Sequence, residues 1–420
     1  MRRTRFLFNK AQSTVPPSLM NKLKMADWRK LPISLPELCI NTTLRCGQSF
    51  RWRRSGEDEW SLALHNRILS LKQDPEALHY RAIFPTSSPL PSPPPLTVEE
   101  DDTLDLIKHY FNLRPNLGQL YEQWASGDSN FKTKAPKFTG VRILNQDVWE
   151  ALIGFICSSN NNISRISQMV EKLCLHYGTY IGDINSQPYH DFPQPKALVG
   201  AKVEQHLREL GFGYRAKYLH RTAQMVEEKG VAWLEGLRNP ESPLLGQTSS
   251  PAGEMIEGGR EGYRHAHEQL LLLQGVGPKV ADCVCLFGLG WGESVPIDTH
   301  VWQIAQRDYK FGKGKHSSLT KATYDAVANH FRALWGKEAG WAHSVLFTAD
   351  LKTFSQRLVT KVEIAKVEGI GKEETGAQVD TSMDSKITLK RVKSESDEND
   401  DALLEAKEEK KRTVKRRRKA

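Results

Sequence analysis

Hydrophobic residues recur at every second position in the first part of the chain. Between residues 28 and 85, Trp60, Leu62 and Leu64 fall on one side of an extended segment, and the alternation returns from residue 68 to residue 84. A period of two places one set of side chains against a core and the other in water. The pattern predicts an antiparallel sheet within an N-terminal domain over residues 28–135.

The spacing of apolar residues becomes helical beyond residue 105. Residues 145–158 are apolar on nearly every side, which is typical of a helix buried at the centre of a domain. Other stretches carry apolar residues at helical intervals: 163–173, 214–225, 261–274, 301–305, 324–334 and 341–350. We therefore predict an α+β fold in which a mostly helical domain over residues 136–356 follows the sheet.

Four stretches lack either period and are predicted to lie outside the two cores. Residues 1–27 form a basic leader, and residues 357–420 form a charged tail without aromatic residues. Residues 87–95 are rich in proline, which favours an extended surface excursion or a protein-binding segment. Residues 238–260 are rich in Pro, Gly, Ser and Glu, which predicts a mobile insertion with no chemistry assigned to it.

Two glycines, Gly275 and Gly277, interrupt the helical pattern. The preceding helix is predicted to end at Gln274, and Pro278 stands where a new helix would take its first residue. Glycines let such a hairpin approach another molecule closely, and the free N–H groups at the start of a helix suit a phosphate. The sequence therefore predicts a helix, a hairpin and a second helix that contact a nucleic-acid backbone.

Lys279 lies in the first turn of that second helix and shares a face with Cys283. The helix dipole and burial both oppose a charge on its amine and so favour the neutral, nucleophilic form. Asp298 precedes a later apolar-periodic segment, where an N-cap carboxylate is expected. Taken singly, the simpler reading pairs Lys279 with Asp282 one turn on. By the same reasoning Asp298 would only cap a helix and Cys283 would only pack in the core.

Composition narrows the class of partner. The chain has 420 residues and a net charge of +9, with much of the basic excess near its two ends. This balance favours a polyanionic partner, although a basic tail equally suits nuclear import. No apolar run reaches the roughly 18 residues that a membrane span needs, so we predict no membrane association.

The cysteines argue against a disulfide framework and against a metal site. All six are scattered through apolar or mixed stretches without a secretory signal, which favours reduced thiols. Cys283 and Cys285 have the wrong spacing for a zinc site, and no second cysteine pair accompanies them. We therefore predict no metal and no other cofactor.

Six separated motifs carry a family resemblance. They read CGQSFRW at 46–52, FICSSNNN at 155–162, LGFGYR at 210–215, VADCVC at 280–285, PIDTH at 296–300 and GWAHSVLF at 340–347. In this order, around the hairpin and Lys279, they resemble the eukaryotic, fungal-like 8-oxoguanine DNA glycosylases of the helix-hairpin-helix superfamily. Relatives with an iron-sulfur cluster need four cysteines after the catalytic segment, which this chain lacks beyond Cys285.

The resemblance implies the catalytic pair. Lys279 would attack the sugar as the base leaves, and Asp298 would stabilise the positive charge that develops there and orient Lys279. Contacts to DNA phosphates are implied for four residues, Gly275, Gly277, Val280 and His300.

The resemblance also implies a pocket for a single everted base. The Gly47 carbonyl would accept the N7–H of 8-oxoguanine, a donor that stands where guanine has an acceptor. Phe347 and the Cys283 side would flank the purine. His343 departs from the family, which usually has glutamine there, and this difference bears on the range of substrates.

Four further residues are implied to face the opposite strand. Asn160, with Arg165 and Arg215, would contact the orphaned cytosine, and Tyr214 would wedge into the duplex. On residues alone, the asparagine run is a cap and turn, and the loop before Tyr214 is an ordinary connection.

The predicted activity is a bifunctional DNA glycosylase and AP lyase of base excision repair. It would remove 8-oxoguanine opposite cytosine through a lysine Schiff base and β-elimination, with other oxidised purines as further candidate substrates. A monofunctional glycosylase for alkylated bases and a noncatalytic helix-hairpin-helix DNA-binding protein are the alternatives. We expect a monomer whose partner is double-stranded DNA, located in the nucleus and, if the leader is a transit peptide, also in mitochondria.

Overall fold

The computed structural model describes residues 27–85, 101–312 and 319–354. The proline-rich excursion, the charged tail and nearly all of the basic leader lie outside these residues. The predictions made for those segments, including the nuclear and mitochondrial signals, therefore stay predictions.

The predicted antiparallel sheet is confirmed. Its five strands stand in the order β1-β5-β4-β3-β2. Their bounds are β1 Arg29–Pro32, β2 Arg53–Arg54, β3 Trp60–Ala63, β4 Ile68–Gln73 and β5 Ala77–Ile83. His65 and Asn66 take positive φ angles of 48° and 59° between β3 and β4, as a tight hairpin turn requires. One sheet face packs its apolar side chains against helix α2, Thr103–Tyr110.

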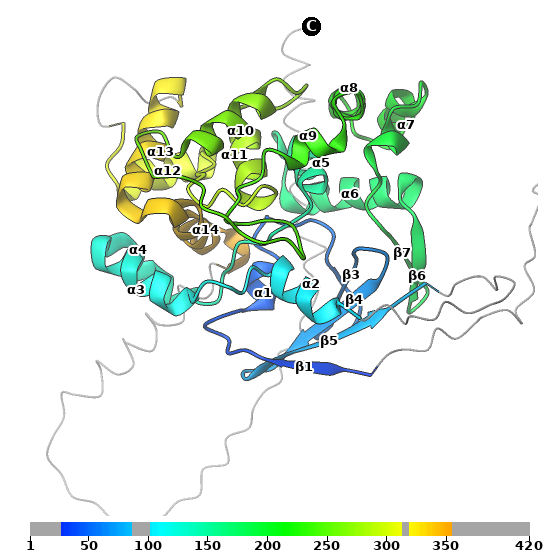
Figure 1. Cartoon of the computed structure of the whole chain (residues 1–420), viewed down its shortest axis with the longest axis horizontal. Helices are drawn as coiled ribbons and strands as arrows, with labels where there is room; N and C mark the ends of the chain where they lie inside the picture. Colours follow the sequence, from blue (N-terminus) through cyan, green and yellow to red (C-terminus); the bar gives the residue numbers. More distant parts are fainter. Residues whose placement is uncertain (1–26, 86–100, 313–318, 355–420) are drawn as a thin grey trace, which may run out of the picture. The chain divides into compact units, whose positions relative to one another are not determined.

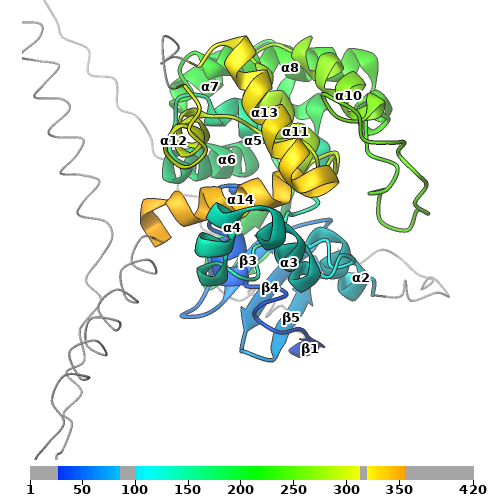
Figure 2. The same ribbon diagram turned by 90° about the vertical axis from the view of Figure 1, so that its left-hand side faces the viewer.

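Helices make up most of the remaining described chain, which confirms the α+β fold. They are α1 Ile40–Thr43, α3 Leu117–Gly127, α4 Ser129–Lys134, α5 Val148–Ser158, α6 Ile163–Tyr177, α7 Val203–Glu209, α8 Arg215–Lys229, α9 Val231–Glu235, α10 Glu261–Leu271, α11 Pro278–Phe287, α12 Thr299–Asp308, α13 Lys321–Trp335 and α14 Ala339–Asp350. Most of them gather on one side of the sheet (Figure 1), and α14 runs between helices such as α5, α6 and α12 and the sheet region (Figure 2). Side chains from α3 and α4 belong to the helical core.

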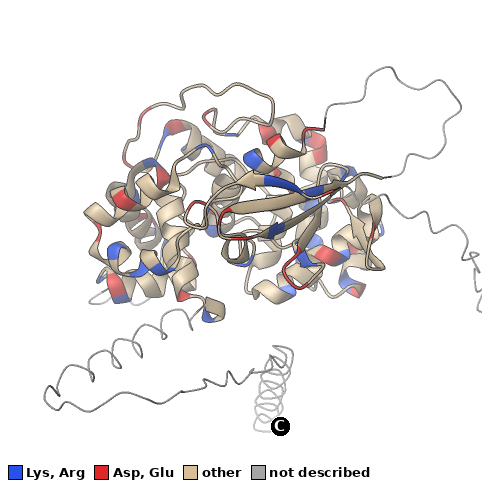
Figure 3. Ribbon diagram, turned by 90° about the horizontal axis from the view of Figure 1, so that it is seen from below, with Lys and Arg blue, Asp and Glu red and all other residues tan. Residues whose placement is uncertain are grey.

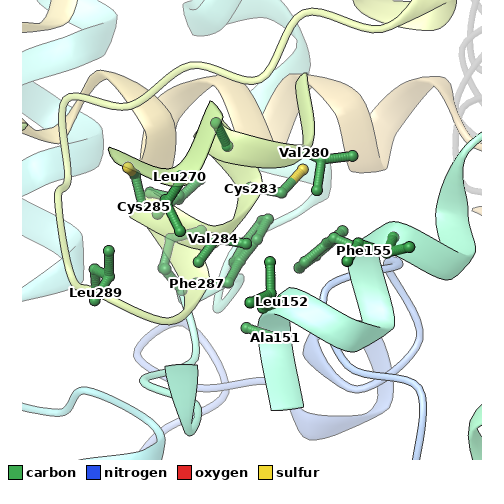
Figure 4. Packing of buried hydrophobic residues seen from close by; sticks show 14 of the residues in the cluster. Ala151, Leu152, Phe155, Leu270, Val280, Cys283, Val284, Cys285, Phe287 and Leu289 are labelled. Atoms are coloured by element: carbon green, nitrogen blue, oxygen red, sulfur yellow. The ribbon is translucent and has the colours of Figure 1, made fainter. Parts of the chain in front are cut away.

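Helix α5 forms the centre of the helical core, as its apolar sequence predicts. Its residues from 148 to 157 are all buried, and the Asp147 side chain caps it by accepting from the Glu150 N–H. Helix α11 packs against it, with Val284 and Phe287 among the buried side chains between the two helices (Figure 4). This pairing brings the start of α11 close to the end of α5.

The helix before the hairpin ends earlier than predicted. Helix α10 stops at Leu271 instead of Gln274, although the leucine pattern continues. Leu272 is 60% exposed, so the last leucines do not extend a buried helical face. Gly275 has a φ of +82°, and a Cβ there would lie 2.7 Å from Tyr218, so the chain must leave the helix to bring this backbone against α8.

Two features near the sheet differ from the sequence interpretation. Residues 47–52 form a loop between α1 and β2, within the stretch over which the antiparallel sheet was predicted. A second hairpin, β6 Tyr180–Ile184 with β7 Gln187–His190, was not predicted at all, and it carries the irregular register between Tyr180 and Gly182. Its proline and short apolar content give only a weak alternation.

The segment predicted as a mobile insertion, between α9 and α10, has no regular secondary structure. Ion pairs and a hydrogen bond hold its two ends. The Arg260 guanidinium, 2% exposed with its residue, pairs with Glu293 at 2.8 Å and with Glu241 at 2.8 Å. Asn239 donates its side-chain N–H to the Gly290 carbonyl. Burial of a paired arginine therefore anchors both sides of the segment.

Charged residues of both signs are interspersed over the face seen from below (Figure 3), with neither sign gathered in one zone. None of the described helices is long and apolar enough to span a membrane.

Candidate active site

One pocket is built from five separated parts of the chain. It is lined by Cys46, Gly47 and Gln48 after α1, Phe155 of α5, Lys279, Cys283 and Phe287 of α11, Pro296, Asp298 and Val301 around the start of α12, and His343, Ser344 and Phe347 of α14. All six residues assigned from the sequence to catalysis and base recognition therefore meet in one place.

Lys279 enters this pocket from the first turn of α11. Gly277 precedes the helix in an extended conformation and Pro278 is its first residue, as predicted. The half-buried amine donates to the Ser158 hydroxyl at 3.1 Å and lies 5.2 Å from the centre of the Phe155 ring. The nitrogen is thus directed against the end of α5.

Asp282 does not pair with Lys279, which excludes the simpler reading of that lysine. Its carboxylate is 1% exposed with its residue and accepts from Tyr263 at 2.6 Å, from Tyr324 and from Ser294 at 2.9 Å. Burial and the charge of Asp282 hold the pKa of both tyrosines well above the ordinary value, so they stay as donors. Asp282 therefore belongs to the packing behind α11.

Asp298 caps α12, as predicted, and also faces the pocket. Its Oδ1 accepts from the backbone N–H groups of His300 and Val301, both at 2.9 Å. Within the described chain its Oδ2 has no hydrogen-bond partner and no ion pair joins it to Lys279. The cap fixes the carboxylate by one oxygen and leaves the other for a ligand.

The floor of the pocket is apolar. The Phe155 and Phe287 rings stack with their centres 5.3 Å apart and their planes 18° apart. Burial raises the pKa of the Cys283 thiol to about 12, outweighing the opposing effect of the Lys279 charge and hydrogen bond. Cys283 is therefore a neutral thiol at physiological pH, in keeping with a flanking surface rather than a nucleophile.

His343 is the most unusual residue of the pocket. It is 7% exposed, and neither ring nitrogen has a hydrogen-bond partner in the part of the chain that the structure describes. Burial lowers its pKa to about 4, with the nearby carboxylates of Asp298 and Asp282 opposing the shift. The neutral ring offers one donor and one acceptor, and its centre lies 6.3 Å from that of Phe347.

Gly47 has little space around it and a left-handed backbone. Its φ is +84°, and a Cβ would lie 3.0 Å from Ile163 and 4.0 Å from Phe347. The neighbouring Gln48 fixes this loop because it donates to the Arg142 carbonyl at 2.8 Å and accepts from the Leu144 N–H at 2.9 Å. The backbone at Gly47 is thus held at the pocket edge.

Two asparagines of the run 160–162 hydrogen-bond to the protein backbone, and the third is exposed. Asn162 caps α6 and Asn161 donates to the Cys157 carbonyl at 3.0 Å, which are the plain roles weighed from the sequence. Asn160 is exposed with a φ of +51°, and its side chain makes no hydrogen bond to the described residues. Arg165 is also exposed, in the first turn of α6.

Tyr214 and Arg215 meet this turn from the start of α8. The 48% exposed Tyr214 donates to the Ser159 carbonyl at 3.1 Å. Arg215 is 4% exposed and donates through Nη2 to the carbonyls of Asn160, at 3.1 Å, and Ser159. The structure thus brings together Asn160, Tyr214 and Arg215, with Arg215 directed at the backbone in this state.

The hairpin exposes backbone where a phosphate contact was predicted. A Cβ at Gly277 would meet nothing within 4 Å, so this face is open. Val280 is buried and can contribute only its backbone N–H, whereas His300 is exposed. The first N–H groups of α11 have no intrahelical acceptor and point to this open side.

Sequence reasoning missed Ser158 and Phe155, which contact the lysine amine through a hydroxyl and an aromatic ring. Both lie in the FICSSNNN motif, but neither residue type indicates a role at that position. Within the described residues, no group of three or more His, Cys, Asp or Glu side chains is arranged to bind a metal ion.

Known proteins resemble this chain over most of its length. Residues 30–152 match the N-terminal domain of 8-oxoguanine DNA glycosylase, and residues 153–335 match the HhH-GPD superfamily of base excision DNA repair proteins. An N-glycosylase/DNA lyase of Saccharomyces cerevisiae is 35% identical over 386 residues, covering 86% of this chain and 96% of its own length.

A second relative and a solved structure extend the likeness. An N-glycosylase/DNA lyase of Arabidopsis thaliana is 34% identical and covers 84% of this chain and 91% of its own length. The apo structure of the Clostridium acetobutylicum 8-oxoguanine glycosylase/lyase has a TM-score of 0.59 at 22% identity and covers 77% of this chain and 96% of its own, which shows the same fold.

Proposed function

We propose, from the premise that this chain belongs to the 8-oxoguanine DNA glycosylase family of helix-hairpin-helix repair proteins, that it excises 8-oxoguanine from duplex DNA opposite cytosine. It is a bifunctional DNA N-glycosylase and AP lyase. The observation that carries the proposal is the single pocket in which Lys279, Asp298 and His343 meet on an aromatic floor.

The reaction begins when the lesion nucleotide leaves the stack and enters this pocket. The Lys279 nitrogen attacks C1′ with its lone pair, so that a nitrogen–carbon bond forms while the bond from C1′ to the purine nitrogen breaks. The electron pair of that bond leaves with the base, which takes up the proton that the newly bonded nitrogen releases. Asp298 stabilises the positive charge on the sugar through the oxygen that the α12 cap leaves unengaged.

Strand cleavage follows from the same covalent bond. Opening of the sugar ring converts the lysine adduct to a protonated Schiff base, which acidifies the hydrogen on C2′. Loss of that proton and departure of the 3′ phosphate oxygen with its electron pair complete the β-elimination. Water then hydrolyses the imine and returns Lys279 as a free amine.

Lesion recognition rests on hydrogen bonds that guanine cannot make. The Gly47 carbonyl accepts the N7–H of 8-oxoguanine, and a normal guanine would leave both acceptors facing each other. His343 supplies one acceptor or donor to the opposite edge of the purine, since its ring is neutral and has no partner among the described residues. Phe347 and Cys283 flank the two faces of the base.

Borohydride trapping tests this function. Wild-type protein should be covalently linked to duplex that contains 8-oxoguanine opposite cytosine, and Lys279→Gln should not be. An undamaged duplex of the same sequence is the control. Base release without an adduct would indicate a monofunctional glycosylase, and binding without either product would indicate a noncatalytic DNA-binding protein.

A further inference from the structure

Ser158 holds the amine of Lys279 in one direction. Its hydroxyl donates to the Phe155 carbonyl at 2.7 Å, one turn back in α5, and accepts from the Lys279 amine at 3.1 Å. A serine hydroxyl has one proton, so the first bond leaves only lone pairs toward the lysine. Ser158 therefore fixes one N–H of the amine and leaves the rest of the nitrogen directed to the pocket.

The turn that follows Ser158 is held by two residues proposed to face the opposite strand. Tyr214 donates to the Ser159 carbonyl at 3.1 Å, and Arg215 donates to the carbonyls of Ser159 and of Asn160. Asn160 itself stands in a left-handed conformation, with a φ of +51°. Asparagine adopts this conformation more readily than most residues, and three donated hydrogen bonds hold the turn in it.

These contacts form one continuous chain from the opposite-strand residues to the nucleophile. Arg215 and Tyr214 contact Ser159, Ser159 is covalently joined to Ser158, and Ser158 contacts Lys279. Tyr214 has a single hydroxyl proton, so it cannot donate to a nucleotide and to the Ser159 carbonyl at the same time. Engagement of this hydroxyl by the opposite strand therefore removes one of the hydrogen bonds that hold the turn.

We propose that Ser158 is a positioning residue for Lys279 and that it couples attack on the sugar to recognition of the opposite strand. This inference rests on the function proposed above. In the DNA-free state the serine holds the amine against α5. When Tyr214 and Arg215 turn to the DNA, the end of α5 adjusts and the same hydroxyl presents the amine to C1′.

Single-turnover trapping of four proteins tests the positioning role. We expect Ser158→Ala to form the borohydride adduct about tenfold more slowly than wild type, the usual effect of one lost hydrogen bond. Ser158→Thr keeps the hydroxyl and should restore most of the rate. Ser159→Ala is the matched control, because only the backbone carbonyl of Ser159 is used. Duplex dissociation constants should be alike in all four.

A double-mutant cycle with Tyr214→Phe tests the coupling. This substitution keeps the ring and removes only the hydroxyl that donates to the Ser159 carbonyl. If the two residues act through one turn, the fold-loss caused by Ser158→Ala should be smaller in the Tyr214→Phe background than in wild type. Losses that simply multiply would overturn the coupling.

Equal adduct rates for wild type and Ser158→Ala would overturn the positioning role, and so would a Ser158→Thr rate as low as that of Ser158→Ala. Should Ser158→Ala fail to fold, Ser158→Cys replaces it, because the thiol has a similar shape and is a weaker acceptor. A wild type that forms no adduct contradicts the proposed function instead. A normal wild type with an unaffected serine variant contradicts only this inference.

Discussion

Polar groups on the two sides of helix α11 differ in how completely protein hydrogen bonds satisfy them. Behind the helix, the buried carboxylate of Asp282 accepts from two tyrosines and a serine. In front, the Lys279 amine donates to the Ser158 hydroxyl, and His343 across the pocket has no hydrogen bond to the described residues. Buried polar groups in folded proteins are nearly always hydrogen-bonded. The face with unused groups is therefore the one that a ligand completes.

The difference has an energetic meaning. Leaving a buried polar group without a partner costs about 1–3 kcal/mol, and no described protein group pairs with the imidazole of His343. A purine that supplies the missing hydrogen bonds recovers this energy on binding. The carboxylate of Asp282 offers no such gain, because its acceptor sites are already occupied by protein donors.

Lys279→Gln should give the largest effect on catalysis. It should also separate most clearly a catalytic role on the pocket side of α11 from a structural role. Loss of the only nucleophilic amine in the pocket should reduce adduct formation by more than about 10³-fold. The free energy of unfolding should change by less than about 1.5 kcal/mol, since one hydrogen bond is lost. Denaturant unfolding and trapping measure the two quantities. A strongly destabilised protein would mean that Lys279 is structural.

Asp298→Asn should lower turnover by about 10²-fold, because the charge opposite the sugar is removed. Asparagine caps a helix about as well as aspartate, so the folded state and duplex affinity should be nearly preserved. Single-turnover rates and a binding isotherm measured together provide the check. Equal losses in rate and affinity would leave Asp298 as a cap alone.

Asp282→Asn should show the reverse behaviour. Replacing this carboxylate disrupts the acceptor for Tyr263, Tyr324 and Ser294, and should cost about 3 kcal/mol of unfolding free energy. The rate per folded molecule should stay within a few-fold of wild type. Tyr324→Phe removes one of these donors and is the control. It should lower the free energy of unfolding by about 1 kcal/mol. A loss of rate without a loss of stability would contradict the structural role of Asp282.

His343→Gln should have the smallest effect at neutral pH, and its effect on stability should appear in acid. The folded state keeps this imidazole neutral to about pH 4, whereas an unfolded histidine takes up a proton near its ordinary pKa of 6.5. The unfolded state therefore gains the proton first, and wild type loses up to about 3 kcal/mol as the pH falls from 6.5 to 4.

Glutamine has no such proton uptake, so the stability difference between His343→Gln and wild type should grow over this pH range and be flat above it. Urea unfolding at several pH values measures that difference. Parallel curves would mean that the ring is charged or solvated in the fold. With 8-oxoguanine opposite cytosine we expect little change in rate, and a large gain on another oxidised purine would show that His343 sets the range of substrates.

The periodic spacing of apolar residues was enough to predict the elements that bury one apolar face. The sheet, the central helix α5 and the cap at Asp298 follow from apolar spacing and from a carboxylate before a helix. The predicted end of the helix before the hairpin was wrong, because Leu272 continues the apolar pattern without being buried. Such leucines carry no signal that separates a helix from the turn after it.

The site was predictable only in part. Lys279, Asp298 and the hairpin combine a chemical type with a position that explains it, and the family resemblance supplied Gly47, His343 and Phe347. Ser158 was missed because a serine at the end of a helix is ordinary in sequence. Only the three-dimensional packing of α11 on α5 brings its hydroxyl to the amine.

The central claim is that the amine of Lys279, and no other amine of the chain, bonds to C1′ of the lesion nucleotide. Mass spectrometry of peptides from the borohydride-reduced wild-type adduct tests it most directly. We predict that the mass of the reduced sugar remnant lies on Lys279. A remnant on any other lysine, or on the N-terminal amine, would contradict the account.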